Sequence, residues 1–498
     1  MTRPASARLA AVLFMLWAAT LSVAHAEPWI DAGDPRMRHD LQLLADYGVI
    51  RAPTMTWPQP WADIAMAVAD ASGDGLPRHV AAALARVREA ADRAADPMHV
   101  EATVAAAQAP TQLRTFADTP REGLQGTASL TAMGDAVAGR LRVTAVARPD
   151  DGKRIRFDGS YGAALLGNWI VSAGYVDRWF GPGQEGSSIL STNARPIPSL
   201  AIDRNHADPF GHPLLSWIGP WRLNISYGVL DDGSMPKNAH FVTVRATARP
   251  LESLELGLAR VIIWCGANRP CDLHSFKNVL VGNESDLRAV NNPGNQLASL
   301  EFRYRLPPRW LPLALYGTLT AEDSVSPHKV NFLLPDVLDL LPKRQLFQYG
   351  LETWGAWGDT AVRAHIEYAD TVCRYSVPNP QFGCAYEHTI YTNGYRYRGR
   401  AIGHALDGDG RMYSLGATLV DRHGDTWTGL ARSVSLNMAG QSRGNTVSKV
   451  PRKLYNLEFS HSRRINIGKF DLGIGYDASY EGPSEHRLRA FAALTVRF

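Results

Sequence analysis

The sequence of 498 residues predicts an all-β transmembrane barrel of about eighteen antiparallel strands that follows a small N-terminal helical domain. Three observations carry this prediction. Residues 469–498 alternate between apolar and polar side chains, strand-like segments of barrel length recur from residue 98 onward, and the connections between them alternate between short and long. Outer-membrane barrels have these properties because each strand crosses the bilayer with one face in lipid and the other in a wet lumen.

The C-terminal hairpin shows the alternation most clearly. Every second residue of its first strand is apolar: Phe470, Leu472, Ile474, Tyr476, Ala478 and Tyr480. Gly482 and Pro483 supply the turn, and the second strand ends the chain on the aromatic Phe498. A period of two fits a strand and not a helix. A soluble sandwich can alternate in the same way, so the rest of the chain decides between the two.

The N-terminus has the features of a secretory signal peptide over residues 1–26. Arg3 and Arg8 flank the start of an apolar run, and Ala24-His25-Ala26 provides a small-x-small cleavage site. An uncleaved anchor is the alternative. Removing Arg3 and Arg8 from the 52 basic side chains leaves 50 against 48 acidic ones. This near-neutral balance argues against a nucleic-acid partner.

Residues 27–97 have a helical pattern. An amphipathic segment ends at Gly48, and alanine-rich segments over 61–69 and 80–94 lie between Pro60, Pro77 and Pro97. We interpret this region as a helical periplasmic domain at the mouth of the barrel. No later stretch holds eighteen consecutive apolar residues, which argues against a transmembrane helix.

Residues 98–498 are assigned to the outer-membrane barrel. Short connections, such as 355–358 and 420–425, alternate with long ones, such as 371–410 and 441–451, which are typical of periplasmic turns and extracellular loops. An even strand number places the helical domain and Phe498 on the periplasmic side. Besides the final hairpin, the predicted strands are residues 99–108, 125–133, 137–148, 154–166, 168–177, 187–202, 221–230, 240–248, 253–263, 296–306, 311–321, 344–354, 359–369, 411–420, 426–436 and 453–461.

The four cysteines form two local pairs, Cys265 with Cys271 and Cys373 with Cys384. In an exported protein this spacing favours two disulfides that each staple a loop. A metal site built from Cys265, Cys271 and His274 is the alternative, although no second cluster with ligand spacing lies nearby. We therefore predict disulfides, with no metal and no cofactor.

The predicted lumen face carries arginines among carboxylates, for example Glu301, Arg303 and Arg305 on one strand. Such residues either form salt bridges that fill the interior or provide a track for an acidic sugar chain. The motifs of serine hydrolases, zinc proteases and nucleotide-binding enzymes are absent, so no enzyme is predicted. Two alternatives remain, a diffusion channel and a barrel hydrolase that pairs a serine with His365 or His388.

Residues 154–198 form the densest candidate site. Strand alternation breaks at Asp177, Arg178 and Trp179, and a sharp turn follows at 181–183. Aromatic rings beside charged groups can hold a saccharide, because the ring stacks on a C–H face while the charges bind hydroxyls or a carboxylate. The alternatives are an aromatic girdle for Trp179 and Phe180, and an internal ion pair for Asp177 with Arg178.

Several segments together resemble the Wzi-type capsule-assembly proteins of Gram-negative outer membranes. They are RFDGSY (156–161), LGNW (166–169), GYxDRWxGPG (174–183), SxNARPxP (191–198), DLQLLADYGVI (40–50) with the following TWP and Trp61-x-x-Ile64, and WCGANRPC (264–271). The resemblance spans nearly the whole mature chain. It implies an outer-membrane lectin that helps retain capsular or related exopolysaccharide on the cell, without catalysis. Phe180 replaces an expected tryptophan, and Gln184-Glu185-Gly186 follows the turn, so a different glycan is implied.

We therefore predict a lectin-like barrel whose partners are an acidic polysaccharide and outer-membrane lipid, and we leave open a contact with polysaccharide export machinery. Arginines are expected to pair with acidic sugar groups, and two tryptophans to stack on sugar rings. The predicted polysaccharide-binding residues are Asp177, Arg178, Trp179, Arg195, Arg204, Arg222 and Trp169.

Overall fold

The computed structural model describes residues 27–280, 294–307, 311–322, 344–374 and 380–498. The predicted signal peptide, residues 1–26, lies outside the described residues. Within them, no helix has both the length and the apolar character needed to cross a membrane.

Three helices occupy the N-terminal region, α2 (Pro35–Asp46), α3 (Trp61–Asp70) and α4 (Arg78–Ala94). Helix α2 begins at Pro35, whose fixed φ suits a first turn, and the Asp34 carboxylate caps it by accepting hydrogen bonds from the Arg36 and Met37 amides. Their apolar faces share one core with Trp57 and Trp179. Two-stranded sheets pair β1 (Trp29–Ile30) with β3 (Gln59–Pro60), and β2 (Thr56–Trp57) with β10 (Trp179–Phe180).

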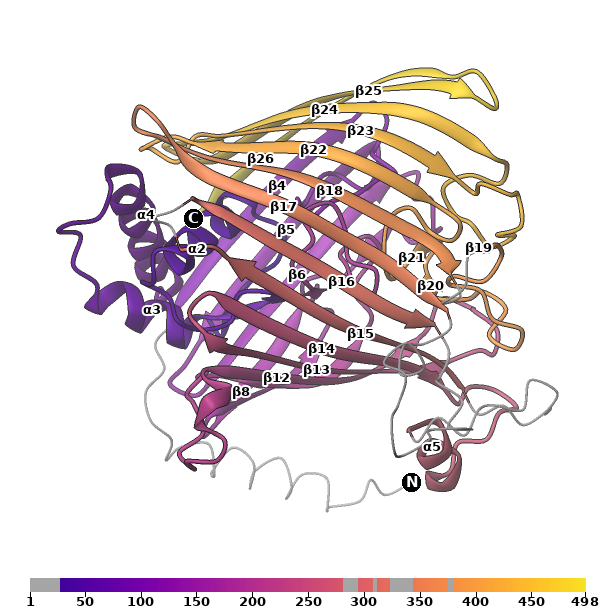
Figure 1. Cartoon of the computed structure of the whole chain (residues 1–498), viewed down its shortest axis with the longest axis horizontal. Coiled ribbons are helices and arrows are strands. Elements are labelled where there is room, and N and C mark those ends of the chain that lie inside the picture. Colours follow the sequence, from indigo (N-terminus) through magenta and orange to yellow (C-terminus); the bar gives the residue numbers. More distant parts are fainter. Residues whose placement is uncertain (1–26, 281–293, 308–310, 323–343, 375–379) are drawn as a thin grey trace, which may run out of the picture.

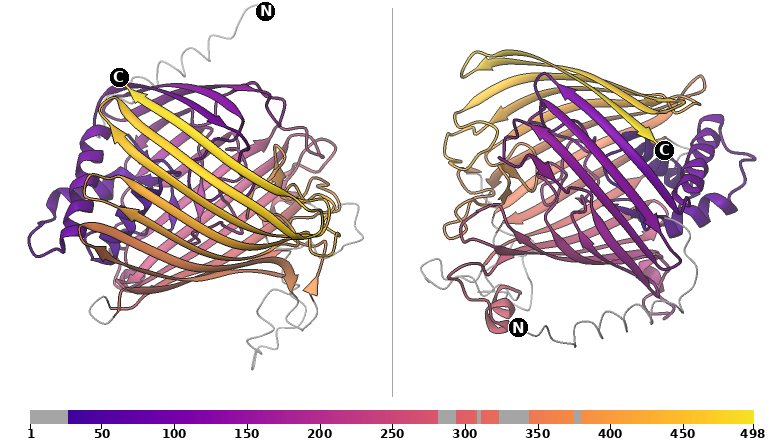
Figure 2. Two further views of the ribbon diagram at one scale, coloured as in Figure 1. Left: turned by 90° about the horizontal axis from the view of Figure 1, so that it is seen from above. Right: turned by 180° about the vertical axis from the view of Figure 1, so that it is seen from behind.

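The remaining strands form a closed antiparallel barrel (Figure 1, Figure 2). Two of its segments, β7 (Ile155–Arg156) and β19 (Pro380–Gln381), are only two residues long. The strands on either side of each also pair directly with one another, so the closed barrel has eighteen strands in the described chain. These are β4 (Met98–Ala107), β5 (Leu124–Met133), β6 (Val137–Ala147), β8 (Tyr161–Leu166), β9 (Trp169–Gly174), β11 (Ser199–Arg204), β12 (Trp221–Leu230), β13 (Ala239–Leu251), β14 (Leu254–Trp264), β15 (Gly294–Arg305), β16 (Leu313–Glu322), β17 (Gln345–Trp357), β18 (Thr360–Arg374), β22 (Arg411–Val420), β23 (Thr426–Leu436), β24 (Arg452–Ile465), β25 (Gly468–Glu481) and β26 (His486–Arg497).

The barrel closes where β26 pairs with β4, in the register Leu494 to Val104. Alternation separates two faces along each strand. On β15, Leu300 and Tyr304 are exposed on the outer wall, whereas Glu301 is fully buried inside. The predicted barrel, its strand number and its lipid-facing apolar residues are confirmed. The structural reason is that the pleat sends successive side chains to opposite faces.

The two ends of the barrel differ. Mostly short connections, including 134–136, 252–253, 358–359 and 466–467, lie at the end that carries the helical domain, here named the turn end. Longer connections, including 108–123, 231–238 and 437–451, lie at the opposite end, here named the loop end (Figure 1). Residues 205–220 are an exception, a long connection at the turn end.

One predicted strand is largely wrong. Residues 187–202 were expected to form a strand, but only β11 (Ser199–Arg204) does so. The residues before it are buried in the lumen. There the Ser191 hydroxyl donates to the Gly403 carbonyl at 2.6 Å, and the side-chain amide of Asn193 donates to the Ala401 carbonyl at 2.9 Å. Bonds to other loops replace the ladder bonds of a strand. Both predicted disulfides, Cys265–Cys271 and Cys373–Cys384, are confirmed, and they leave no thiolate for the alternative metal site.

Candidate functional site

Residues 175–198, here named the inner segment, leave the wall after β9 and fold into the lumen. Their short strand β10 pairs with β2 of the helical domain, Trp179 opposite Trp57. The Arg38 guanidinium of α2 donates to the Pro182 and Gly183 carbonyls at 3.2 and 2.6 Å. The inner segment thereby joins the helical domain in the interior of the barrel.

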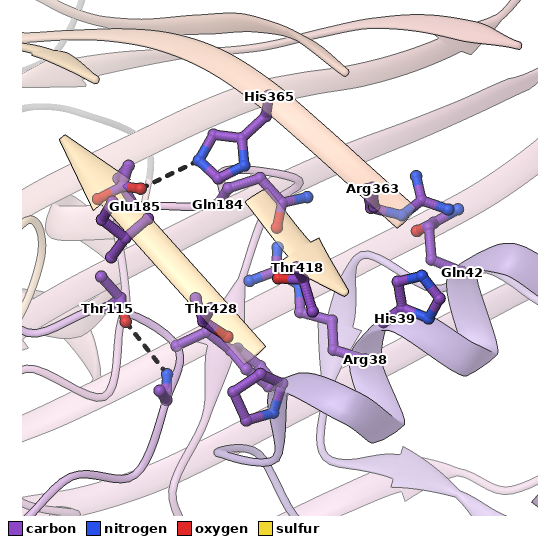
Figure 3. A pocket seen from close by; sticks show the side chains of 14 residues that line it. Arg38, His39, Gln42, Thr115, Gln184, Glu185, Arg363, His365, Thr418 and Thr428 are labelled. Carbon is purple, nitrogen blue, oxygen red and sulfur yellow. Dashed lines mark hydrogen bonds and ion pairs between the residues drawn. The ribbon is translucent and has the colours of Figure 1, made fainter. Parts of the chain in front are cut away.

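A buried charge cluster fixes the middle of the inner segment to the wall. One Glu185 oxygen accepts from the Arg432 guanidinium at 2.6 Å, and the other lies 3.0 Å from His365 Nε2. Figure 3 shows this pair beside a cavity of about 60 Å³ that also touches Arg38 and Gln42 of α2. Such a volume holds only a few water molecules. His365, a candidate of the hydrolase alternative, is therefore bonded to a carboxylate.

Similar ion pairs tie the helical domain to the wall. Asp46, at the end of α2, contacts Arg303 at 2.8 Å and Arg363 at 2.7 Å, and Glu352 contacts the same two arginines. All four side chains are buried. These inward arginines therefore form the salt-bridge network that was one of the two sequence interpretations.

Residues 380–410, here named the cap loop, cover the inner segment from the loop end. The hydroxyls of Tyr386 and Tyr395 each donate to an inner-segment carbonyl at 2.6 Å, on Ser188 and Ile189 respectively. Both tyrosine side chains are fully buried. The lumen in the described structure is thus occupied from both ends.

A larger cavity, of about 390 Å³, opens between the cap loop and its neighbours at the loop end. Its volume falls in the range of about 300–1,000 Å³ that is usual for small-molecule sites. Carboxamides, carboxylates, guanidiniums and a hydroxyl dominate its lining. The lining residues are Gln112, Asp150, Asp151, Asn193, Asp232, Asn393, Arg398, Gly399, Arg400, Thr446 and Val447.

A tight hairpin of the cap loop places the two arginines of this cavity. Strand β20 (Arg396–Tyr397) pairs with β21 (Arg400–Ala401) around the two-residue turn Arg398-Gly399. Both turn residues have positive φ, 48° and 76°, as hairpin turns of this length require. Arg396 anchors the hairpin below through the Asp407 carboxylate, with Nε to Oδ2 at 2.9 Å.

The two arginines have different partners. Arg398 contacts the Asp231 carboxylate at 2.8 Å. Arg400 donates to the Gln112 carbonyl at 3.3 Å and forms no ion pair with a carboxylate of the described residues. Burial and the nearby Arg121 guanidinium lower the pKa of Arg400 to about 10. Arg400 therefore stays cationic at neutral pH while its charge is poorly compensated, which favours an anionic ligand.

One carboxylate of the cavity lining, that of Asp151, is already paired. Asp151 contacts Arg156 at 3.0 Å and Arg195 at 2.5 Å. Burial alone would raise the pKa of Asp151, but the Lys153 amide and the two guanidiniums outweigh it and hold that pKa below its usual range. Asp151 therefore stays ionised and can accept hydrogen bonds from hydroxyls.

The structure separates the seven residues that the sequence proposed. Arg195 is the nearest to the loop-end cavity, held by Asp158 and by the cavity residue Asp151. Asp177, Arg178 and Arg195 together line a separate small cavity of about 30 Å³. Trp179 is 0% exposed and packs edge-on against Phe116. Its ring is covered by protein.

The other three proposed residues lie at the turn end. The Arg222 guanidinium pairs with the Asp63 carboxylate of α3 at 2.8 Å. Trp169 and Arg204 are cross-strand neighbours on β9 and β11. Val171 and Leu200, two and four residues along those strands on the same face, are exposed on the outer wall, so Trp169 and Arg204 face outward. They share no cavity with Arg195.

None of the residues that line the loop-end cavity was among the seven predicted, and Arg400, Arg398, Gln112 and Asn393 are four of those that were missed. One local signal was available, since the stretch TNGYRYRGR over residues 392–400 combines aromatic residues, arginines and a hairpin turn. Its position over the lumen depends on contacts with distant loops.

Comparisons with known proteins agree with this architecture. The family model described as capsule assembly protein Wzi matches residues 99–468. A Klebsiella pneumoniae protein described as an uncharacterized 55.8 kDa protein in the cps region is 29% identical over 452 residues, which cover 88% of this chain and 82% of that protein. The solved structure of Escherichia coli Wzi, described as an outer membrane protein involved in group 1 capsule assembly and as a carbohydrate-binding β-barrel, has a TM-score of 0.80 and 25% identity, over 94% of this chain and 99% of that one. The predicted resemblance is confirmed, and the chain belongs to the Wzi capsule-assembly family of outer-membrane barrels.

Proposed function

We propose that this protein is a non-enzymatic lectin that binds an acidic capsular or related exopolysaccharide in the loop-end cavity and helps attach it to the cell surface. The observation that carries the proposal is the polar cavity of about 390 Å³ around Arg400, a half-buried arginine with no carboxylate partner among the described residues. Membership in the Wzi family, and the carbohydrate binding described for the Escherichia coli structure, support the same class of ligand.

The proposal places the loop end outside the cell and the helical domain in the periplasm. Long loops on one side and short turns on the other support this orientation, since outer-membrane barrels carry their long loops extracellularly. A polysaccharide at the cell surface then reaches the cavity without crossing the barrel.

The chemistry of the lining fits a sugar chain. Carboxamides such as Asn193 and Asn393 and the Thr446 hydroxyl can both donate to and accept from hydroxyl groups, while ionised Asp151 accepts. Arg400 supplies the charge-assisted bond to a sugar carboxylate. Binding of this kind needs no metal or cofactor, and the proposal assigns no catalytic residue.

Replacing Arg400 by alanine tests the site. A hydrogen bond to a charged group contributes about 1.5–3 kcal/mol, so we expect the affinity for the native acidic polysaccharide to fall by roughly 10- to 100-fold. Titration of the purified full-length barrel in detergent with that polysaccharide measures the affinity. The same titration with carboxyl-reduced polysaccharide should show little difference between the parent protein and Arg400→Ala.

Arg443→Ala is the matched control, because Arg443 is an exposed arginine of the neighbouring loop that does not line the cavity. We expect its affinity to match that of the parent. Equal affinities of Arg400→Ala and the parent would contradict the loop-end cavity as the binding site. An absence of polysaccharide binding by the parent would overturn the function itself.

The diffusion-channel alternative makes a different prediction. The helical domain, the inner segment and the cap loop occupy the lumen, and the cavity between α2 and the inner segment holds only about 60 Å³. We therefore expect the purified protein in planar lipid bilayers to show no stable, large open-state current. A reproducible porin-like conductance would favour the channel over the lectin.

A further inference from the structure

A second surface lies at the turn end, away from the loop-end cavity. Residues 209–219, here named the apolar loop, connect β11 to β12 and have the sequence PFGHPLLSWIG, without a Lys, Arg, Asp or Glu. Leu214, Leu215 and Trp217 are 76%, 42% and 68% exposed. Large apolar side chains that are exposed next to one another mark an interaction surface.

Aromatic stacking holds the apolar loop against the outside of the barrel. Trp221 alternates on β12 with the buried Arg222 and lies on the same face as exposed Ile225, so it faces outward. Phe210 of the apolar loop stacks on the Trp221 ring, with centroids 4.5 Å apart and planes 9° apart. The Arg204 guanidinium lies 3.8 Å from the same ring. The apolar loop therefore starts on the lipid-facing wall and away from the lumen.

The far end of the apolar loop is fixed to the same wall. The Arg249 amide of β13 donates to the Pro220 carbonyl at 2.9 Å. Gly219 has a φ of 70°, and a Cβ there would lie 2.2 Å from the Arg249 carbonyl oxygen, so only glycine permits this approach. Leu251, next to this contact, is 58% exposed and extends the apolar surface.

The backbone of the apolar loop satisfies much of its own hydrogen bonding. The amides of Leu215 and Ser216 donate to the His212 carbonyl at 2.9 and 3.0 Å, and the Ile218 and Gly219 amides donate to carbonyls three residues earlier, each at 3.1 Å. The Ser216 hydroxyl donates to the Pro213 carbonyl at 2.9 Å. Internal bonding lowers the cost of moving a backbone from water to a less polar phase.

From these contacts, we propose that the apolar loop is a membrane anchor that inserts Leu214, Leu215 and Trp217 into the interfacial region of the leaflet on the helical-domain side. The occupant is lipid, because the loop continues the lipid-facing wall of the barrel and carries no charge. Tryptophan favours this depth, where its ring is in an apolar layer and its N–H reaches polar groups. The Arg204 guanidinium beside Trp221 faces the headgroups.

A fluorescent probe at residue 216 tests the anchor in the full-length protein. The four cysteines are paired in two disulfides, so the thiol introduced by Ser216→Cys is the one available for labelling with an environment-sensitive dye. In phosphatidylcholine vesicles with brominated acyl chains, we expect blue-shifted emission and at least about twofold quenching relative to unbrominated vesicles. Ser72→Cys, in the exposed α3–α4 connection of the same end, is the matched control and should remain unquenched.

A second protein separates insertion by the apolar side chains from mere proximity to the barrel. In Ser216→Cys combined with Leu214→Ser, Leu215→Ser and Trp217→Ser, we expect the probe to lose its quenching and to become accessible to aqueous dithionite, while the heat-dependent gel mobility of the barrel is retained. The anchor is overturned if the probe at residue 216 behaves like the probe at residue 72. It is also overturned if the three serines leave the quenching unchanged.

Discussion

Replacing Asp46 by alanine is expected to lower the free energy of unfolding by about 3–5 kcal/mol, because the change leaves buried arginines short of an anion. Asp46 is fully buried at the end of α2 and contacts the Arg303 and Arg363 guanidiniums at 2.8 and 2.7 Å. In the variant, Glu352 is the one carboxylate of the described residues that still contacts both guanidiniums. Since Asp46 belongs to α2 and the arginines belong to the barrel wall, the variant is expected to weaken the contact between the helical domain and the barrel.

Two measurements check this expectation. Guanidinium unfolding of the detergent-solubilised protein gives the change in stability, and trypsin cleavage within residues 27–97 reports whether the helical domain detaches. Asp70→Ala is the matched control, because Asp70 is an exposed carboxylate at the end of α3. If the two variants unfold at the same guanidinium concentration and resist trypsin equally, the ion pairs of Asp46 do not hold the domain in place.

Trp179→Ala is also expected to cost about 3–5 kcal/mol, the range observed when a large buried aromatic side chain is truncated. The Trp179 ring is 0% exposed, packs 5.4 Å from Phe116 and lies 5.3 Å from the Arg38 guanidinium. Its removal leaves a cavity where the inner segment meets the helical domain. A residue that only stacked on a sugar would instead weaken binding and leave stability unchanged.

The same guanidinium unfolding experiment separates these roles. Trp357→Ala serves as the control, because Trp357 is 79% exposed at the β17–β18 turn and should change stability little. Stability equal to that of the parent, together with weaker polysaccharide binding, would return Trp179 to the set of sugar-contact residues and contradict its place in the core.

The sequence was sufficient for most of the barrel because alternation is local. On β25, the apolar residues Leu472, Ile474 and Tyr476 are exposed on the outer wall as predicted. The prediction of a strand over residues 187–202 failed for a physical reason. Its buried Ser191 and Asn193 side chains bond to the cap loop, which lies far along the chain, so the local sequence pattern could not reveal these partners.

The candidate site was less accessible to sequence reasoning. Arg178, Arg195, Arg204 and Arg222 have similar local surroundings in the sequence, yet the structure places Arg222 against Asp63 at the turn end and Arg195 against Asp151 at the loop end. A charged residue next to an aromatic one can be an ion pair, an interfacial stack or a ligand contact. The choice depends on the barrel end and wall face to which the chain carries it.

By itself, the sequence determined the closed barrel, the helical N-terminal domain, the two disulfides and the family, because each rests on a short-range pattern of hydrophobicity or spacing. The tertiary structure decided which charges remain uncompensated and which aromatic rings remain accessible. Those properties depend on contacts between segments far apart in the chain, such as Asp46 with Arg303 and Arg363, or Gln112 with Arg400. Electrostatic and packing energies follow distance in space, and sequence separation does not fix that distance.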